Sequence, residues 1–478
     1  MTIGHEVRGA VVGAMYWVPL DQIDAHRVRK HFTIEKHGRD FMTKAPTYSE
    51  TPIYRMGVGD YAGFIGLPLA EGMRLFPCPD YTEDLSYGTP FLRGTHWHRL
   101  PDPNHPLAAP GQAEFMRLAE EAVRENYATL VKADTGTGKT VVALSISAKL
   151  GYSTVVKVPL DRLAKQWAKA AIQHLGMDKK DIGYIVGDKC QHDRPLVIAM
   201  QKSLAVRTYS PEVYRAFGFE ITDEVHNTGA PVASQSQGLF NAAHRLNLSA
   251  TDERRDGSHR VYHANAGQPA FERSMPGMPT AVLCINFTTK KGYGDGNKSV
   301  KLINLAYDFP RNRIITNTVA RWYEQGHYPL ILCDHVRHAH ILWKMLIKDG
   351  VPENKIGFYT GEQPGDETGT RGKSSPDYLE WCEKHATVVI ATYGMMKEGI
   401  DMPRLDRGMD ASPRADLVQA LGRIRRIHPG KDRAIWATIR DRGDRDFDGL
   451  YFARVQKLSQ LENVTIHHVA ADDVPAWR

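Results

Sequence analysis

A short glycine-rich stretch, Ala133-Asp134-Thr135-Gly136-Thr137-Gly138-Lys139-Thr140, has the clearest chemical potential in the chain. It follows an apolar segment typical of a strand and opens a helix-like segment, as a phosphate-binding loop does. Glycines allow a turn that points backbone N–H groups at phosphate oxygens, and a helix N-terminus adds positive potential. We expect Lys139 to reach the β- and γ-phosphates of a nucleoside triphosphate and Thr140 to ligate Mg²⁺. The strict pattern begins with Gly, where this chain has Ala133. The predicted phosphate-binding residues are Thr135, Gly136, Thr137, Gly138, Lys139 and Thr140.

Two adjacent acids, Asp223 and Glu224, follow the strand-like segment Phe219–Thr222. A carboxylate at a strand end can hold Mg²⁺, and its neighbour can polarise an attacking water. An Asp-Glu pair alone is common on protein surfaces, but its place behind a phosphate loop favours a catalytic interpretation. We therefore predict Asp223 as a metal ligand and Glu224 as the residue that directs the water.

A basic segment, Gln419-Ala420-Leu421-Gly422-Arg423-Ile424-Arg425-Arg426, is compatible with a helix. Gln419, Arg423 and Arg426 would share one helix face. Arginine stays protonated and forks onto phosphate oxygens, so Arg423 and Arg426 are candidates to neutralise charge that develops on a γ-phosphate. Taken alone, a solvated basic helix face explains the segment better.

Two alternations of short apolar strands with amphipathic helices, at about 110–250 and 279–440, must position these groups. Such alternation predicts parallel sheets covered by helices on both faces. The predicted fold class is α/β, with two tandem parallel-sheet lobes and a small α+β N-terminal domain. The expected domains are an N-terminal accessory domain (1–105), a first lobe (106–252), a connector (253–278), a second lobe (279–440) and a C-terminal helical tail (441–478).

Composition excludes few classes of function. The net charge of +6 is a modest basic bias, which on its own leaves nucleic-acid binding open. Five cysteines, an odd number without a CxxC pair, disfavour a disulfide framework or zinc ribbon and favour a reducing cytoplasm. The apolar run 9–20 could pass for a signal-peptide core, but no cleavage pattern follows it, so we predict a buried strand. No run approaches the roughly 18–20 apolar residues of a membrane span, so no membrane partner is expected.

In their order and spacing, these segments resemble the motifs of superfamily 2 helicases with a DEAH- or DExH-type box. The phosphate loop resembles motif I, Asp223–His226 motif II, Ser249–Thr251 motif III and Gln419–Arg426 motif VI. Val158-Pro159 with Gln166-Trp167 resembles motif Ia, and Met200–Leu204 resembles motif Ib or Ic. Thr392–Gly394 with Glu398–Asp401 resembles motif V, and Gln112 resembles an upstream glutamine that reads adenine.

The resemblance implies two RecA-like lobes that close around ATP and Mg²⁺. The first would supply Lys139, Thr140, Asp223 and Glu224, and the second Gln419, Arg423 and Arg426. It also implies nucleotide contacts from Gln112, Gly399 and Asp401, and nucleic-acid contacts from Pro159, Gln201, Lys202 and Thr392.

After motif III, Asp252–Gly257 resembles a stretch of XPB-type and UvsW-like phage DNA helicases, with Arg255 where Glu is usual. This implies an ATP-dependent helicase or translocase acting on branched or duplex DNA in branch migration, fork remodelling, replication, recombination and repair. If the chain is phage-encoded, the cytoplasm is that of a bacterial host. The residues expected to couple hydrolysis to DNA are Ser249, Thr251, Arg254, Arg255 and Asp256. By a loose resemblance, the N-terminal domain would recognise DNA.

Several alternatives stay open. Lys290 and Lys291 open a basic, glycine-rich insertion that is either a mobile element that grips nucleic acid or a solvated hairpin. The substrate could be RNA, or the chain could be an ATP-gated nucleic-acid clamp or sensor without processive unwinding. A phosphate-loop kinase is disfavoured by the second lobe. The expected partner is forked or junction DNA, and the expected oligomeric state is a monomer.

Overall fold

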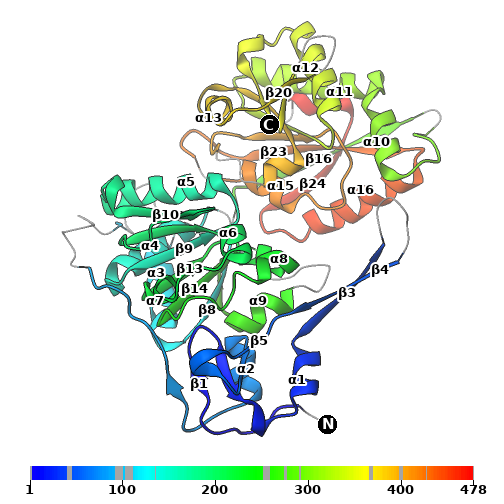
Figure 1. Cartoon of the computed structure of the whole chain (residues 1–478). Coiled ribbons are helices and arrows are strands. Elements are labelled where there is room, and N and C mark those ends of the chain that lie inside the picture. Colours follow the sequence, from blue (N-terminus) through cyan, green and yellow to red (C-terminus); the bar gives the residue numbers. More distant parts are fainter. Residues whose placement is uncertain are drawn as a thin grey trace. The chain divides into compact units, whose positions relative to one another are not determined.

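The computed structural model describes residues 3–39, 46–91, 101–102, 111–134, 136–250, 259–273, 277–289, 292–364, 370–397, 402–426 and 428–476. The chain divides into two compact units, Met1–Met275 and Pro276–Arg478 (Figure 1). Among the described residues, no helix is both long and apolar enough to cross a membrane.

The first unit is built around a sheet in the order β11-β10-β12-β9-β13-β14-β8-β15. All its neighbouring strands pair in parallel except β10 and β11. The strands are β8 (Thr129–Ala133), β9 (Thr154–Val158), β10 (Ile182–Val186), β11 (Lys189–Cys190), β12 (Leu196–Met200), β13 (Phe219–Thr222), β14 (His244–Ser249) and β15 (Pro269–Arg273). Central strands are buried on both faces, as parallel strands between helices are.

Helices cover both faces of this sheet (Figure 1). One core contains buried residues of α3 (Gln112–Glu125), α4 (Lys139–Leu150) and α5 (Asp161–Ala170). The opposite face packs against α6 (Gln201–Val206) and α7 (Pro211–Arg215). The unit also contains α8 (Pro231–Ser234) and α9 (His259–Ala266).

The N-terminal region has its own small core and sheet, in the order β5-β6-β2-β1-β7. Its elements are β1 (Val11–Val12), β2 (Tyr16–Pro19), α1 (Ala25–His31), β5 (Arg55–Met56), β6 (Phe64–Leu67), α2 (Leu69–Leu75) and β7 (Thr82–Glu83). The apolar run 9–20 therefore forms two short paired strands in which Val12, Tyr16 and Val18 are buried. A separate hairpin, β3 (Thr33–Arg39) and β4 (Pro46–Pro52), extends away from this core (Figure 1).

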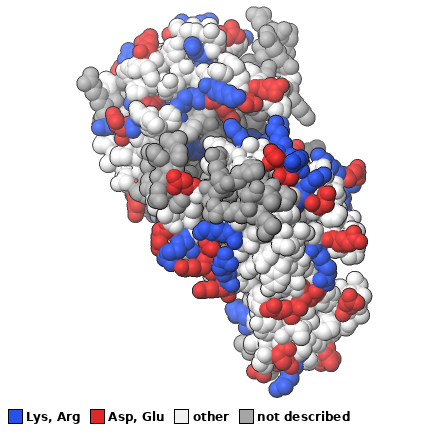
Figure 2. Space-filling view, turned by 90° about the vertical axis from the view of Figure 1, so that its left-hand side faces the viewer, with Lys and Arg blue, Asp and Glu red and all other residues white. Residues whose placement is uncertain are grey.

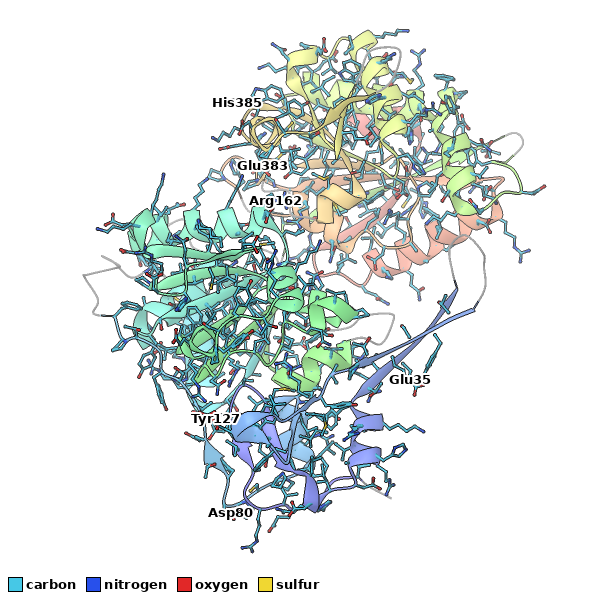
Figure 3. All side chains as sticks on the ribbon, in the orientation of Figure 1. Glu35, Asp80, Tyr127, Arg162, Glu383 and His385 are labelled. Atoms are coloured by element: carbon cyan, nitrogen blue, oxygen red, sulfur yellow. The ribbon has the colours of Figure 1, made fainter. Side chains whose placement is uncertain are left out.

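The N-terminal region is docked on the sheet of the first unit by polar contacts. Asp84 accepts two hydrogen bonds of 2.7 Å from Arg215 of α7. The hydroxyl of Tyr127, labelled in Figure 3, donates to Glu83 and lies 2.9 Å from the hydroxyl of Tyr81. Within the stretch 253–278, α9 packs against α2 and β15 forms the edge strand beside β8, so residues 259–273 belong to this unit.

The second unit has a parallel sheet in the order β18-β21-β17-β22-β23-β16-β24. Its strands are β16 (Thr280–Thr288), β17 (Pro329–Cys333), β18 (Ile356–Tyr359), β21 (Val388–Thr392), β22 (Arg407–Asp410), β23 (Ala434–Arg442) and β24 (Val464–Val469), with a hairpin of β19 (Glu362–Pro364) and β20 (Thr370–Lys373). The helices are α10 (Lys298–Ala306), α11 (Phe309–Glu324), α12 (Val336–Lys348), α13 (Pro376–His385), α14 (Tyr393–Lys397), α15 (Val418–Ile424) and α16 (Arg445–Leu458). Among the described residues, this unit has one apolar core rich in α11 and α12 residues, one rich in α15 and α16 residues, and a smaller cluster between α10 and α16. The tail is part of this fold, because α16 packs on β23 and β24 pairs with β16.

Candidate active site

The phosphate loop lies between β8 and α4. Gly136 and Gly138 have φ angles of +94° and +85°, a left-handed conformation that glycine adopts without steric cost. The chain can therefore turn sharply and begin α4 at Lys139. The Lys139 ammonium donates to the carbonyl oxygens of Ala133 at 2.7 Å and Asp134 at 3.4 Å, so it folds over the loop.

Gln112 lies directly against this loop. It is the first residue of α3, and its side chain is buried. A Cβ atom added at Gly138 would lie 2.0 Å from the Gln112 Nε2 atom, so only glycine fits at that position without displacing the amide. The structure thus brings together two residues that are well separated in sequence. A role for Gln112 in reading adenine stays a prediction.

Asp223 lies at the carboxyl end of β13 and is held by two donors. The Trp167 indole N–H donates to Oδ2 at 2.8 Å, and the Glu224 backbone N–H donates to Oδ1 at 3.0 Å. Burial and the Glu224 charge together raise the pKa of Asp223 to about 6, against the opposing effects of Trp167 and Lys139. A buried carboxylate with these partners is suited to a divalent cation, which would stabilise its charged form.

Glu224 connects motif II to motif III. Its φ of +49° is a left-handed conformation, uncommon for a residue with a Cβ and often found at functional sites. Its carboxylate lies 3.3 Å from Nδ1 of His226, and the same nitrogen lies 3.2 Å from the Ser249 hydroxyl. Residues from β14 and from the turn after β13 therefore meet in one polar chain.

The predicted nucleic-acid contacts of the first unit have different environments. Lys202 is exposed and Pro159 is half-buried. Gln201 is only 2% exposed, and its amide donates to the carbonyl of Asp223 at 3.3 Å. In this placement Gln201 supports the motif II turn, and its contact with nucleic acid stays a prediction.

In the second unit, α15 carries the predicted arginine fingers. Gln419 is exposed, whereas Arg423 and Arg426 are half-buried. Between them, Arg425 donates to the carbonyls of Met278 and Glu462, which anchors the end of the helix to its own unit. Thr392, the last residue of β21, is half-buried, and its hydroxyl accepts from the Met395 backbone N–H at 3.5 Å.

The described part of the basic insertion is packed at its two ends and exposed between them. Tyr293 is buried against Phe447 of α16. Lys301 lies in α10, 9% exposed, and forms ion pairs with Asp444 at 3.2 Å and Asp446 at 2.7 Å. Tyr293 and Lys301 therefore pack against α16, whereas residues 294–300 between them are exposed, so both alternatives for the exposed part of the insertion stay open. Other predicted site residues lie outside the described ranges: Thr135, Thr251, Arg254, Arg255, Asp256, Lys290, Lys291, Gly399 and Asp401.

Charge on the visible surface does not by itself identify a nucleic-acid interface. On the face seen in Figure 2, the Lys and Arg side chains drawn in colour are interspersed with Asp and Glu. This agrees with a net charge of only +6. The nucleic-acid interface is therefore predicted from motifs and individual contacts, and not from surface charge.

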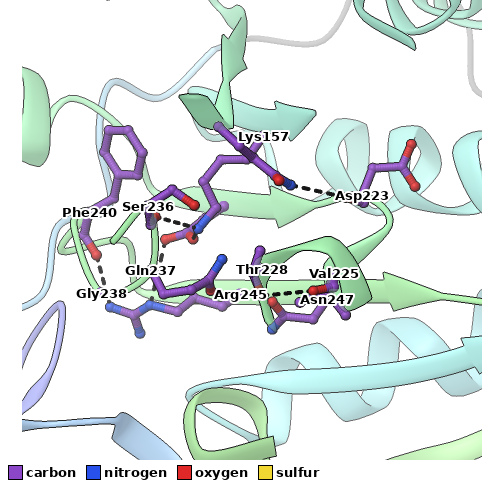
Figure 4. A network of polar contacts seen from close by, with 12 residues as sticks. Lys157, Asp223, Val225, Thr228, Ser236, Gln237, Gly238, Phe240, Arg245 and Asn247 are labelled. Carbon is purple, nitrogen blue, oxygen red and sulfur yellow. Dashed lines mark hydrogen bonds and ion pairs between the residues drawn. The ribbon is translucent and has the colours of Figure 1, made fainter. Parts of the chain in front are cut away.

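Sequence reasoning missed a buried polar network behind the catalytic ends of three strands (Figure 4). Lys157 of β9 forms an ion pair with Glu220 of β13 and donates to the Ser236 carbonyl at 3.1 Å. Arg245 of β14 donates to the carbonyls of Gly13, at 2.7 Å, and Phe240, at 3.1 Å. The available signal in the sequence was the pair of opposite charges, Lys157 and Glu220, within two otherwise largely apolar strand segments.

Comparison with known proteins matches the region that carries motifs I to III. Residues 108–254 match the family described as "Type III restriction enzyme, res subunit". The chain is 25% identical over 409 residues to the putative ATP-dependent RNA helicase L396 of Acanthamoeba polyphaga mimivirus, covering 83% of this chain and 74% of that protein. It is 32% identical over 162 residues to the DNA 3'-5' translocase XPB2 of Sulfurisphaera tokodaii, covering 34% of this chain and 36% of that protein.

A solved structure of another protein shares the fold of this chain. The solved structure of Saccharomyces cerevisiae Dbp5 bound to RNA and ADP BeF3 superposes with a TM-score of 0.51 at 13% identity. The match covers 76% of this chain and 90% of that one. At this identity the likeness concerns the fold alone, and it confirms the predicted α/β class with tandem RecA-like lobes.

Proposed function

This chain belongs to the superfamily 2 helicases, ATP-dependent enzymes that act on nucleic acids, and we propose that its substrate is branched or duplex DNA. On such DNA it would work as a translocase in branch migration or fork remodelling. The observation that carries the enzymatic part is the grouping, within one unit, of Lys139, Asp223, Glu224, His226 and Ser249 around the ends of β8, β13 and β14.

The residues of the first unit fit a nucleoside triphosphate with Mg²⁺. Bound ATP supplies the phosphoanhydride bond whose hydrolysis releases energy. The glycine turn and Lys139 would bind its phosphates, and Thr140 and Asp223 would hold the cation. Glu224 would orient a water and accept its proton, with His226 beside its carboxylate and Ser249 holding His226. The contact between Glu224 and His226 supports this assignment.

Arg423 and Arg426 would complete the site from the second unit, with Gln419, Gly399 and Asp401 as further nucleotide contacts. Guanidinium groups stabilise charge that develops on transferred phosphoryl oxygens. Loss of the γ-phosphate would then remove contacts that favour one arrangement of the units. ATP would thus shift the equilibrium between two arrangements of the units, because a ligand favours the arrangement that it binds more tightly.

DNA is favoured over RNA by the 32% identity to XPB2, which is named as a DNA translocase, and by the resemblance of residues 252–257 to that group. The mimivirus relative is named as an RNA helicase, which supports RNA as the second candidate. In both cases the nucleic acid would contact Lys202, Pro159, Thr392, Lys290 and Lys291, and residues 249–256 would couple its binding to hydrolysis. We propose that the chain acts as a monomer.

ATPase assays with duplex DNA, forked DNA, a four-way junction and RNA of matched length test this proposal. We expect low turnover alone and the largest stimulation by branched DNA. Equal or greater stimulation by RNA would favour the second candidate. Stimulated hydrolysis without strand displacement or branch migration would instead indicate an ATP-gated clamp.

A further inference from the structure

In the second unit, the ammonium group of one lysine is surrounded by main-chain carbonyls. Lys431 lies between α15 and β23. Its Nζ atom donates to four carbonyl oxygens: Pro403 at 2.9 Å, Leu405 at 2.7 Å, Ile424 at 2.9 Å and Arg426 at 2.7 Å. Because an ammonium has three protons, these four short contacts enclose it on several sides.

The Lys431 ammonium loses part of its hydration in this position. Burial, together with the nearby Arg426 and Arg407, lowers the pKa of Lys431 to about 8, and Asp406 opposes this shift. A partly buried charge needs polar partners to offset lost hydration, and here the four carbonyls provide them. An apolar side chain of similar length would leave those oxygens without their donor.

The four carbonyls belong to two segments with predicted roles at the ATP site. Ile424 and Arg426 lie at the C-terminal end of α15, where the last carbonyls have no intrahelical partner and a positive charge is favourable. Pro403 and Leu405 lie in the segment between motif V and β22. One side chain therefore ties the end of the motif VI helix to the chain that follows motif V.

We propose that Lys431 is a positioning residue for ATP hydrolysis, which fixes the end of α15 against residues 403–405 and so fixes the backbone that carries Arg423 and Arg426. The inference rests on the proposed role of these arginines. Displacing a catalytic group by about 1 Å can cost on the order of a hundredfold in rate. A tether at the Arg426 carbonyl restricts such displacement.

The test compares Lys431→Met with Lys384→Met in the full chain. Lys384 lies on α13 of the same unit, and its exposed side chain pairs with Glu380, one turn earlier in that helix, at 2.6 Å. We expect Lys431→Met to lower the kcat of DNA-stimulated ATP hydrolysis at least about tenfold. ATP affinity, measured with a fluorescent non-hydrolysable analogue, should change less than about threefold, because the phosphate loop lies in the other unit. Lys384→Met should have the same kcat and the same ATP affinity as the wild type.

A second variant separates positioning from general stability. Lys431→Arg keeps a cation and several donors at the helix end, so its kcat should lie between those of the wild type and Lys431→Met. A kcat of folded Lys431→Met within about twofold of the wild type would overturn the inference. The inference would also be overturned if Lys431→Arg and Lys431→Met had the same kcat at equal thermal stability. If Lys431→Met does not fold, Lys431→Gln replaces it in the comparison with Lys431→Arg. Failure of the proposed function is distinguishable, because the wild-type chain itself would then show no nucleic-acid-stimulated hydrolysis.

Discussion

The hydrogen bond from Trp167 opposes the rise in the pKa of Asp223, because a hydrogen bond to a carboxylate favours its ionised form. Trp167→Phe removes the 2.8 Å bond to Oδ2, so the pKa of Asp223 should rise above its present value of about 6. If hydrolysis needs this group ionised, the acidic limb of the kcat/KM profile should move towards neutral pH. Steady-state ATPase assays from pH 5.5 to 8.5 measure the shift.

Trp322→Phe is the matched control for this change. Trp322 is equally buried, in the second unit, and within the described part of the chain its indole N–H has no hydrogen-bond partner. Its replacement should leave the pH profile unchanged. Identical acidic limbs in the two variants would show that Trp167 does not tune the site.

His338 gives the second unit a pH-dependent stability. It is fully buried between Asn312, at 2.9 Å, and Ser412, at 3.5 Å. Burial, with the nearby Arg311 and His335, lowers its pKa to about 3. Between pH 6.5 and 3, the unfolded chain therefore binds a proton that the folded chain does not, and folding stability falls as pH falls.

His338→Gln should remove this linkage. At pH 7.5 the variant should be less stable than the wild type by about 1–2 kcal/mol, because buried hydrogen bonds are perturbed. At pH 5 the difference should shrink. Urea unfolding of the full chain at both pH values measures it, and a difference independent of pH would contradict the assignment.

At the scale of elements, the N-terminal region and the first sheet share one polar network. Arg55 of β5 donates to the carbonyls of Gly238 at 2.8 Å, Gln237 at 3.0 Å and Gln235 at 3.1 Å. Arg245 makes the reciprocal bond, from β14 to Gly13. The loop that Arg55 holds also contains Ser236, which accepts from Lys157. Docking of the N-terminal region thus supports the strands behind motifs Ia, II and III.

Arg55→Met should therefore destabilise the first unit by about 2–3 kcal/mol, since charged donors to several buried carbonyls are lost. Arg117→Met removes an exposed arginine of α3 that pairs with Glu114 and Glu121, and it should leave the free energy of unfolding nearly unchanged. Chemical unfolding with limited proteolysis of the loop 235–238 measures both. Equal stability of the two variants would contradict this role for the network.

At the scale of the whole molecule, each unit has its own sheet and its own apolar cores. Fragments 1–275 and 276–478 should therefore fold separately. The first should bind ATP through Lys139 and its neighbours but hydrolyse it at least about a hundredfold more slowly, because Arg423 and Arg426 lie in the second. Circular dichroism, nucleotide binding and ATPase assays on each fragment test this.

Lys139→Ala in fragment 1–275 is the matched control, and it should abolish nucleotide binding. Normal hydrolysis by fragment 1–275 would contradict the predicted arginine fingers. A fragment beginning at residue 106 should fold poorly, because it lacks the partners of Arg215 and Arg245.

Much of this organisation follows from local sequence. The loop 133–140 and the pair Asp223-Glu224 are contiguous, and their glycine and strand-end chemistry is fixed by near neighbours. The period of apolar residues likewise predicted both parallel sheets, because a strand buried on two faces needs an uninterrupted apolar stretch. Family, ATP use and fold class were therefore accessible without coordinates.

Tertiary structure decided which polar side chains are available to ligands and which support the fold. Gln201 and Lys301 lie in segments whose sequence is typical of nucleic-acid contacts. In the structure, however, Gln201 donates to the Asp223 carbonyl, and Lys301 pairs with two aspartates at the start of α16. Lys157 and Lys431 belong to no motif, and Trp167 lies in motif Ia without a predicted bond to Asp223. The partners of all three lie on distant segments. Burial makes such pairing obligatory, but the partner is set by the packing of whole elements, which no local pattern encodes.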